Sequence, residues 1–371
     1  MTVAAPALRV VVNVVSQTAG GGTTVARHVV RELALLRPDW QLEVHVSDAV
    51  KEVDWPSTVR VVRHAGLASA GRRIVWEQLV LPRILNRGGA DAYVAMGGFA
   101  CFFARLPQVC VWQNALIWAP ETPGRSASSR LYIRVQRAFL KRSIRIARVN
   151  IFPSRIAVDE LSDALGHRPP NSVVSYFGPP DVPDSHSAPR EAFVLAVGDI
   201  YLHKNYKTLI EAFVIYRREF GGLMHLKIAG APIDRRCQLE LESLIRETGS
   251  SSFVRMLGRQ SAAQVRSLYR AASVFVTSSQ IESFGLTPLE AMASDLPVLA
   301  ARASATPEIC GGAAMYFDPA SPQDLARLLH TLEADAEVRA KLRSAGRLRV
   351  AEFSWQKTAR EYAEAVQSAT S

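Results

Sequence analysis

Two glutamates in the second half of the chain have the residue type and spacing of a ligand-binding pair. Glu282 and Glu290 are separated by seven residues within Ser278–Ala301, which reads SSQIESFGLTPLEAMASDLPVLAA. The apolar run Val274–Thr277 predicts a strand, and the pattern after it predicts a helix that begins at Leu286. Glu282 would therefore lie on a loop and Glu290 on the following helix. Carboxylates placed in this way can accept hydrogen bonds from two different sets of hydroxyls.

The loop between the two glutamates also offers backbone donors. Ser283, Phe284 and Gly285 lead into the helix at Leu286, and N–H groups at a helix start favour an anion or the hydroxyls of a sugar. The plainer interpretation makes one glutamate a helix cap and the other an exposed helical residue. The sequence on both sides of the pair favours ligand binding.

Two further features could contact a phosphate. Lys204 follows a strand that ends near Gly198 and lies just before a predicted helix, where its ammonium can reach a phosphate oxygen. The alternative is an ordinary solvated lysine. Gly20–Gly22 follows the first predicted strand, and glycines there let backbone N–H groups approach an anion. The alternative for these glycines is a plain tight turn.

The elements that would position these residues alternate along the chain. Short apolar runs such as Leu8–Val15 are followed by helical patterns such as Thr24–Leu36, and the alternation restarts at Ala192–Val197 after the proline-rich stretch Phe177–Arg190. Such alternation predicts βα units around a parallel sheet. We therefore expect an α/β protein with two doubly wound domains, a linker and a cleft between them. Ligands of such sheets bind beyond the carboxyl ends of the strands.

These segments together resemble the retaining glycosyltransferases of the family-4 type, or glycosyltransferase group 1, which carry a Glu-x7-Glu motif. Glu282 and Glu290 supply that motif, and its flanks agree with the family, as do VGDIYLHKN from Val197 and ATPEICGGAAMYFDP from Ala305. The later FSWQKTAREYAEAV, which begins at Phe353, also agrees. These motifs lie within residues 193–366, whereas the first half matches only in organisation and in its glycine-rich loop.

The resemblance implies the GT-B fold, with two Rossmann-like domains and a deep interdomain cleft. Residues 1–180 would bind the acceptor, residues 181–350 would bind the nucleotide-sugar donor, and residues 351–371 would form a helix that crosses back to the first domain. The implied reaction moves a sugar from a nucleoside-diphosphate sugar to an acceptor hydroxyl, with retention at the anomeric carbon. It would need no metal and no permanently bound cofactor, because a lysine, helix N-termini and backbone amides stabilise the leaving group.

The resemblance also implies roles for single residues. Lys204 would bind the donor diphosphate, Glu290 the ribose hydroxyls, and Glu282 the transferred sugar, and these three would form the catalytic set. Gly21 and Gly22 would close onto the diphosphate from the other domain. The full set of implied donor-binding residues is Gly21, Gly22, Gly198, Lys204, Arg259, Glu282, Ser283, Phe284, Gly285, Leu286 and Glu290.

Three positions, in two segments, depart from the family pattern. Asp199 stands where many relatives have arginine or serine, and because an anionic residue beside a diphosphate is unfavourable, Arg259 is the candidate replacement cation. Gln113 and Asn114 stand where many relatives have a His-Asp pair. Neutral amides can bind sugar hydroxyls but cannot act as a general base, which favours proton transfer to the departing phosphate oxygen on the same face. Trp118 is a candidate for the acceptor site, with core packing as the alternative.

A basic helix in the first half could contact a membrane. The segment Thr122–Val158 holds nine basic residues and no acidic one. Six basic residues three or four positions apart form one helical stripe. They are Arg130, Arg134, Arg137, Lys141, Arg145 and Arg148. A basic amphipathic helix suits anionic lipid headgroups. The rival interpretation is a helix packed on its own domain, with solvated arginines.

Length and composition narrow the remaining choices. The chain has 371 residues, of which 48% are hydrophobic and 21% charged, and a formal net charge of +10. These values are typical of a globular protein of two domains. No run suits a membrane span or a signal peptide, and the four cysteines lack metal-ligand spacing and suggest buried thiols in a reducing cytosol. We expect a cytoplasmic protein, peripheral on the inner face of the cytoplasmic membrane. Nucleic acid is not an expected partner, because no nucleic-acid module appears.

The sequence therefore predicts a retaining glycosyltransferase that uses a nucleotide sugar and a glycan, lipid-linked or small-molecule acceptor. Bacterial polysaccharide, lipopolysaccharide or glycolipid assembly is the expected setting, with a lean toward mannosyl transfer. Two alternatives stay open: a non-catalytic protein that binds nucleotide sugars or polyanions, and a GT-B nucleotide-sugar epimerase. The joint presence of Lys204, Glu282 and Glu290 argues against the first, and the Glu-x7-Glu context against the second.

Overall fold

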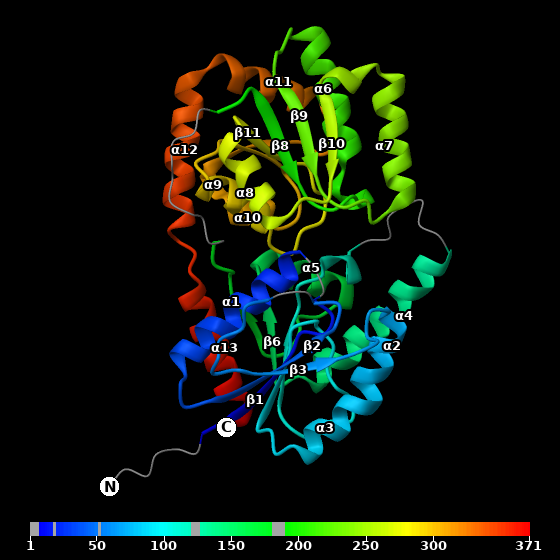
Figure 1. The fold of residues 1–371 in the computed structure, drawn as a ribbon, viewed down its shortest axis with the longest axis vertical. Coiled ribbons are helices and arrows are strands. Elements are labelled where there is room, and N and C mark those ends of the chain that lie inside the picture. Colours follow the sequence, from blue (N-terminus) through cyan, green and yellow to red (C-terminus); the bar gives the residue numbers. More distant parts are fainter. Residues whose placement is uncertain (1–6, 18–19, 51–52, 120–126, 180–189) are drawn as a thin grey trace. The chain divides into compact units, whose positions relative to one another are not determined.

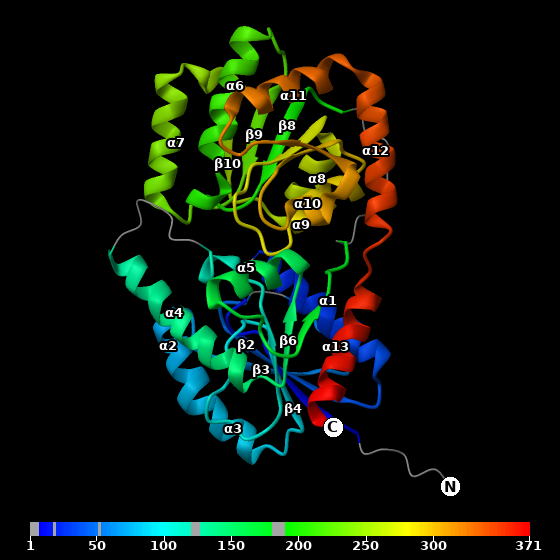
Figure 2. The same cartoon turned by 180° about the vertical axis from the view of Figure 1, so that it is seen from behind.

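The chain folds into two compact units. The computed structural model describes residues 7–17, 20–50, 53–119, 127–179 and 190–371. Unit 1 consists of Met1–Gly178 together with Ser354–Ser371, and unit 2 of Pro179–Phe353. Each unit contains a parallel β-sheet with helices on both faces, shown in Figure 1 and from behind in Figure 2. The expected α/β class with two doubly wound domains is therefore confirmed. Most of the proline-rich stretch, residues 180–189, lies outside the described residues.

Unit 1 is built on a seven-stranded sheet in the order β3-β2-β1-β4-β5-β6-β7. Its strands are β1 (Arg9–Asn13), β2 (Gln41–Ser47), β3 (Arg60–His64), β4 (Ala92–Ala95), β5 (Gln108–Val111), β6 (Val149–Phe152) and β7 (Ser172–Val174). Its helices are α1 (Gly21–Leu36), α2 (Ala70–Val75), α3 (Leu81–Arg87), α4 (Ala127–Ile146), α5 (Arg155–Leu165) and α13 (Trp355–Thr370). A π-helical turn, η1 (Trp76–Val80), joins α2 to α3, and the short 3₁₀ turn η2 (Ala115–Ile117) follows β5.

The last helix of the chain belongs to unit 1. Helix α13 packs beside α1 and contacts β4, β5 and β6 (Figures 1 and 2). The Trp355 ring stacks on His28, with 4.5 Å between the ring centroids, and Thr358 Oγ1 donates to the Tyr176 carbonyl at 2.7 Å. A side chain at Gly178 would lie 2.4 Å from the Trp355 backbone nitrogen, so only glycine fits where the two segments meet.

Unit 2 repeats the design with a six-stranded sheet in the order β10-β9-β8-β11-β12-β13. Its strands are β8 (Phe193–Val197), β9 (His225–Ala229), β10 (Val254–Gly258), β11 (Val274–Thr277), β12 (Val298–Ala301) and β13 (Ala314–Phe317). Its helices are α6 (Tyr206–Glu219), α7 (Arg235–Glu247), α8 (Ala262–Ala271), α9 (Leu286–Ala293), α10 (Thr306–Cys310), α11 (Pro322–Ala334) and α12 (Ala336–Val350). Short 3₁₀ turns are η3 (Leu202–Lys204), η4 (Ser250–Ser252) and η5 (Gly311–Ala313).

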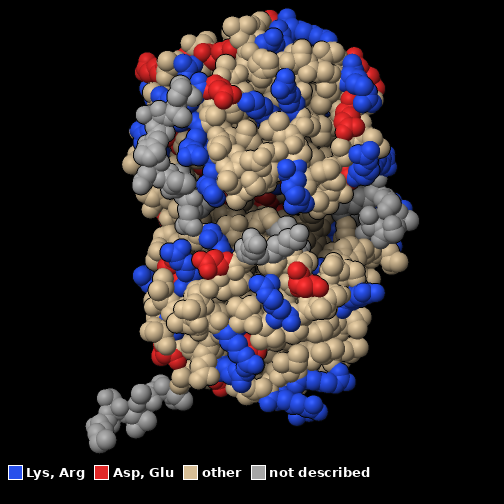
Figure 3. Space-filling model, in the orientation of Figure 1, with Lys and Arg blue, Asp and Glu red and all other residues tan. Residues whose placement is uncertain are grey.

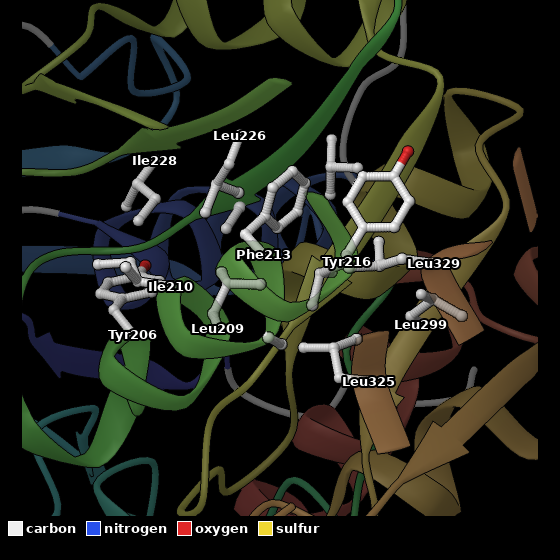
Figure 4. Packing of buried hydrophobic residues seen from close by; sticks show 14 of the residues in the cluster. Tyr206, Leu209, Ile210, Phe213, Tyr216, Leu226, Ile228, Leu299, Leu325 and Leu329 are labelled. Atoms are coloured by element: carbon white, nitrogen blue, oxygen red, sulfur yellow. The ribbon is translucent and has the colours of Figure 1, made fainter. Parts of the chain in front are cut away.

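The core of unit 2 follows from strand periodicity. Every second residue of β8 and β9, such as Val194 and Leu226, points to one face and packs against α6 and α11. Figure 4 shows Phe213 and Leu209 of α6 and Leu325 of α11 meeting these strand residues. The alternate residues Phe193 and Leu195 of β8 are also buried, whereas on β9 His225 is exposed and Lys227 is half-buried. Strands buried on both faces need continuous apolar runs, which is why the strand segments are recognisable in the sequence.

None of the described helices is long and apolar enough to cross a membrane. The four cysteines, Cys101, Cys110, Cys237 and Cys310, are buried free thiols.

A buried carboxyl lies beneath the carboxyl end of β1. Glu77, on the π turn, is 8% exposed, and its Oε1 accepts from Asn13 Nδ2 at 2.9 Å. The same Asn13 amide donates to Tyr93 Oη at 2.9 Å, while Asn13 Oδ1 accepts from the Val15 N–H at 3.2 Å. Burial raises the pKa of Glu77 to about 7, against the hydrogen bond from Asn13. The π turn thus places a titratable group under the loop that links β1 to α1.

This carboxyl predicts a pH-dependent stability of unit 1. The folded-state pKa is raised, so the Glu77 contribution is complete below about pH 4.5 and is lost as the pH rises through about 7. Between those limits wild type should lose about 3 kcal/mol of unfolding free energy relative to Glu77→Gln. All six tryptophans lie in unit 1, so their fluorescence during urea unfolding reports on this unit. A wild-type-minus-variant difference that does not change with pH would contradict this account.

Candidate functional site

Two loops meet at the carboxyl ends of adjacent strands in unit 2. One loop follows β8 and contains η3, and the other follows β11 and runs from Ser278 to Gly285. Ser278 Oγ donates to the Lys204 carbonyl at 2.7 Å, and the Gln280 N–H donates to the His203 carbonyl at 2.8 Å. These bonds fasten the two loops together. The residues predicted from each loop are thereby brought to one place.

Lys204 and Glu282 form an ion pair at this junction. Lys204 Nζ lies 2.5 Å from Glu282 Oε1, and the two side chains are 19% and 18% exposed. Burial alone would raise the pKa of Glu282, but the Lys204 ammonium outweighs it and holds that pKa below its ordinary value. Glu282 is therefore ionised at neutral pH, and the pair offers one cation and one anion side by side.

The close approach of Lys204 depends on missing side chains. A Cβ at Gly198 would lie 3.0 Å from Tyr206 Oη and 3.4 Å from Lys204 Cε. A Cβ at Gly230 would lie 1.9 Å from the Gly198 carbonyl oxygen. Glycine at 198 thus lets the end of β8 contact the Tyr206 hydroxyl and the lysine stem, and glycine at 230 lets the end of β9 approach the β8 backbone.

Helix α9 presents its N-terminus beside this pair. Gly285 is the N-cap residue, with φ of 97°, and no side chain of the described residues caps the helix. Phe284 is buried and packs edge-on against Phe353, with 5.9 Å between ring centroids. The anchored phenylalanine and the left-handed glycine turn the chain sharply into α9. The first amides of α9, from Leu286 onward, lack intrahelical acceptors and favour an anion.

Glu290 has a different environment from Glu282. It lies on α9, and its Oε2 accepts from the Tyr269 hydroxyl at 2.8 Å. Burial raises the pKa of Glu290 above its ordinary value, and the hydrogen bond from Tyr269 opposes this rise. Tyr269 lies on α8, which the sequence pattern marks only as an apolar helix position, so the sequence analysis did not single it out.

Asp199 does not stand as a free anion beside the lysine. Its Oδ1 accepts from the Ala231 N–H at 2.8 Å, and the Ile200 N–H donates to the Ala231 carbonyl at 2.8 Å. The carboxylate therefore fixes the turn after β9. Arg259, the expected replacement cation, is exposed after β10, a strand separated from β8 by β9. Among the described residues, no hydrogen bond or ion pair joins Arg259 to Lys204 or Glu282, and its role as a replacement cation stays a prediction.

The glycine-rich segment of unit 1 is helical, which corrects the expected loop. Helix α1 begins at Gly21, three residues before the expected start at Thr24, and Gly20 is its N-cap with φ of 69°. Gly21 is exposed in the first turn. A Cβ at Gly22 would lie 1.7 Å from Gln17 Oε1, so this position is occupied by the Gln17 side chain. Gly22 serves packing within unit 1.

Gln113 lies near the Gln17 side chain, and Asn114 follows it in the chain. Gln113 Nε2 and Gln17 Nε2 both donate to the Met96 carbonyl, at 3.3 and 2.9 Å. Asn114 Oδ1 accepts from the Leu116 N–H at 3.1 Å and caps η2. Trp118, expected at an acceptor site, is buried, and its Nε1 donates to Glu160 Oε2 on α5 at 3.2 Å. The packing alternative therefore holds for Trp118.

The basic stripe on α4 is broken at one position. Arg137 is half-buried and donates to the carbonyls of Ile117 and Ala119 at 2.9 and 2.6 Å. It therefore braces the segment after β5 and does not belong to the exposed basic surface. The other residues of the predicted stripe are exposed. They are Arg130, Arg134, Lys141, Arg145 and Arg148.

A metal site does not emerge from the part of the chain that the structure describes, where no three His, Cys, Asp or Glu side chains cluster suitably. Of the residues predicted to bind the donor, the charged ones placed at the junction are Lys204, Glu282 and Glu290. The arrangement can bind an anion at Lys204 and α9, and hydroxyls at the two carboxylates.

The model of the family "Glycosyl transferases group 1" matches residues 181–349. Unit 2 carries a group 1 glycosyl transferase domain. Every residue of the junction lies in this domain, including Lys204, Glu282 and Glu290. The predicted resemblance is therefore confirmed over the domain that holds the candidate site.

Two curated relatives are similar to parts of this chain. Mannosylfructose-phosphate synthase of Agrobacterium fabrum is 34% identical over 138 residues, which are 36% of this chain and 30% of that protein. The serotype-specific mannosyltransferase WbdA of Escherichia coli is 29% identical over 181 residues, which are 47% of this chain and 22% of that protein. The chain thus spans less than a third of the length of these relatives.

A solved structure extends the likeness to both units. HepE of Anabaena, crystallised in complex with UDP-glucose, matches 97% of this chain and 100% of its own, with a TM-score of 0.74 and 19% sequence identity. At that identity the likeness concerns the fold. The GT-B fold expected from the sequence is confirmed.

The contact between Gln17 and Gly22 makes a prediction about unit 1. Gly22→Ala must displace the Gln17 amide from the Met96 carbonyl and should cost about 1–2 kcal/mol of unfolding free energy. In a Gln17→Ala background the cost should vanish, because the obstructing atoms are gone. Gly71→Ala, on α2 with open space around it, is the matched control. Urea unfolding followed by tryptophan fluorescence measures these changes, and an equal cost of Gly22→Ala in both backgrounds would refute the packing role.

Proposed function

We propose that the protein is a retaining glycosyltransferase that transfers a sugar from a nucleoside-diphosphate sugar to an acceptor hydroxyl. The observation that carries the proposal is the Lys204–Glu282 pair, 2.5 Å apart, with three residues between Glu282 and α9, whose N-terminus no described side chain caps, in a group 1 glycosyl transferase domain. A diphosphate needs cations and oriented N–H donors, and a sugar needs carboxylates that accept from its hydroxyls. This junction supplies both.

In this proposal the donor binds to unit 2. Lys204 and the first amides of α9, from Leu286 onward, receive the diphosphate, with Ser283, Phe284 and Gly285 shaping the approach. Glu282, ionised through its contact with Lys204, accepts from the hydroxyls of the transferred sugar. Glu290 accepts from the ribose hydroxyls. The charge on the leaving diphosphate is stabilised by the lysine and the helix N-terminus, so the proposed reaction needs no metal.

The transfer step is proposed to proceed on one face of the donor sugar. The bond from the anomeric carbon to the phosphate oxygen breaks, and the acceptor oxygen forms the new bond on the same face. The acceptor proton moves to the departing phosphate oxygen. Neutral Gln113 and Asn114 fit this scheme, because an amide can orient a hydroxyl but cannot take its proton. Retention of anomeric configuration follows from the same-face geometry.

Bacterial polysaccharide, lipopolysaccharide or glycolipid assembly is the proposed setting. A mannosyl donor is favoured by two names among the similar proteins, a serotype-specific mannosyltransferase and a mannosylfructose-phosphate synthase. The acceptor would be a glycan, lipid-linked or small-molecule hydroxyl compound bound to unit 1.

Sugar transfer from a panel of nucleoside-diphosphate sugars tests the proposal. Wild type should transfer in the presence of EDTA, and Lys204→Ala and Glu290→Ala should each lower the rate by at least about a hundredfold, because each removes a charged donor contact. Lys207→Ala, an exposed lysine on the next turn, is the matched control and should keep full activity.

Wild-type turnover in Lys204→Ala or Glu290→Ala would overturn the role of that residue. Activity that disappears with EDTA and returns with a divalent cation would overturn the metal-independent scheme. The anomeric configuration of the product, read by NMR, should match that of the donor sugar.

We also propose that unit 1 docks on an anionic membrane. Apolar side chains are exposed on the α2–η1–α3 segment, on α4 and between β4 and β5, for example Leu79 at 50%, Leu131 at 63% and Phe103 at 59%. The wider set also contains Val75, Val80, Ile84, Tyr132 and Val135. The Arg142 guanidinium lies over the Phe102 ring, 4.8 Å from its centroid, and thereby connects α4 to the segment between β4 and β5. We call this the basic–apolar surface.

Charge complementarity favours anionic lipid as the partner of the basic–apolar surface. Between residues 70–87, 99–105 and 130–148 the one acidic residue is Glu77, which is buried. Figure 3 shows Lys and Arg side chains on the side of unit 1 where Figure 1 places α2, α3 and α4. The exposed basic residues are Arg72, Arg83, Arg87, Arg105, Arg130, Arg134, Lys141, Arg142 and Arg145. Exposed apolar side chains ringed by cations suit the headgroup region of a bilayer.

Vesicle binding tests the membrane proposal. Replacing Arg134, Lys141 and Arg145 with glutamine should weaken binding to phosphatidylglycerol-rich vesicles by about two orders of magnitude, at about 1 kcal/mol for each charge. The control removes three exposed charges from unit 2, by Lys207→Gln, Arg235→Gln and Arg266→Gln. Equal loss of binding in both triple variants would show a general charge effect and contradict docking through the basic–apolar surface.

A further inference from the structure

A buried tyrosine holds one of the two glutamates of the junction. Tyr269 is 3% exposed on α8, and its ring packs near Phe275 of β11, with 5.6 Å between centroids. Its hydroxyl lies 2.8 Å from Glu290 Oε2 and 3.3 Å from the Thr287 carbonyl. Packing fixes the ring, and two acceptors on α9 fix the hydroxyl. Tyr269 therefore restrains the side chain of a residue on a different helix.

The contact leaves one oxygen of Glu290 available. A carboxylate has two oxygens, and the Tyr269 hydroxyl binds Oε2 only. Glu290 is partly exposed, although it is surrounded by buried residues of α9 such as Leu289 and Ala291. A long glutamate side chain without such a restraint has several rotamers, and ordering it on binding costs free energy. The tyrosine removes that freedom before any ligand arrives.

We propose that Tyr269 is a positioning residue that presents Glu290, in one orientation, to the vicinal hydroxyls of the donor nucleoside. This inference rests on the proposed donor-binding function of the junction. Lys204 plays the corresponding part for Glu282, at 2.5 Å. Glu282 is thus held by a cation and Glu290 by a neutral donor. Because Glu290 needs no cation of its own, the positive charge of Lys204 stays at the proposed diphosphate site.

The hydrogen bond from Tyr269 also affects the low-pH limb of the pH profile of nucleotide binding. Burial raises the pKa of Glu290, and the Tyr269 hydroxyl opposes that rise. Loss of the hydroxyl should therefore raise the pKa of Glu290 further and move the acid limb of nucleotide binding to higher pH. A tyrosine that merely filled space would not move this limb.

Calorimetric titration of the full chain with nucleoside diphosphates tests the inference. The uridine, guanosine and adenosine diphosphates, which all carry vicinal ribose hydroxyls, are compared first, and the tightest one is taken together with its 2′,3′-dideoxy analogue. Tyr269→Phe should weaken binding of the normal diphosphate about tenfold and leave binding of the dideoxy analogue unchanged within about twofold. Tyr216→Phe is the matched control, because its buried hydroxyl accepts from the Met224 N–H on the α6 side of the sheet.

The outcomes separate a positioning role of Tyr269 from a purely structural one. Equal weakening of both ligands by Tyr269→Phe, or an acid limb that does not move, would overturn the positioning role and leave the glycosyltransferase proposal standing. Failure of wild type to bind any of the diphosphates would overturn the proposed function and this inference with it. Glu290→Ala provides a check that needs no change at Tyr269, since removal of the acceptor should remove the preference for the hydroxylated nucleotide. Persistence of that preference in Glu290→Ala would also overturn the inference.

Discussion

The ion pair between Lys204 and Glu282 is the interaction around which the candidate site of unit 2 is organised. Two charges with less than a fifth of their side-chain surface exposed must stay paired, because either one alone would be buried without compensation. Glycine at Gly198 leaves room for the lysine stem, and Ser278 binds the lysine carbonyl from the neighbouring loop. The parallel order of β8 and β11 places both loops at the same edge of the sheet. The strand order of the sheet therefore also brings the residues of the candidate site together.

The two glutamates of the junction have opposite electrostatic surroundings. Lys204 lowers the pKa of Glu282, whereas burial raises the pKa of Glu290 against the hydrogen bond from Tyr269. One carboxylate thus carries a firm negative charge beside a cation, and the other is an acceptor held by a neutral hydroxyl. A donor molecule has a charged diphosphate and uncharged hydroxyls, and this division of environments matches those two needs.

The sequence predicts helices and strands well where apolar periodicity is strong. It does not predict which side chain packs into the space beside a glycine. Lys204 and Glu282 could be placed together because each follows a parallel strand, whose carboxyl ends share an edge. Three other contacts could not be predicted, because each depends on the orientation of a side chain. They are the Gln17 side chain beside Gly22, the Asp199 carboxylate on the Ala231 N–H, and the Tyr269 hydroxyl on Glu290. Periodicity says which face a residue is on and nothing about its partner.

The central claim is that the Lys204 ammonium is the binding point for a donor diphosphate. The most direct measurement compares, by calorimetry on the full chain, a nucleoside diphosphate with the nucleoside that lacks both phosphates, in wild type and in Lys204→Met. The account predicts that the diphosphate binds far more tightly than the nucleoside to wild type, and that this advantage collapses in the variant. An advantage of the diphosphate that survives undiminished in Lys204→Met would contradict the account.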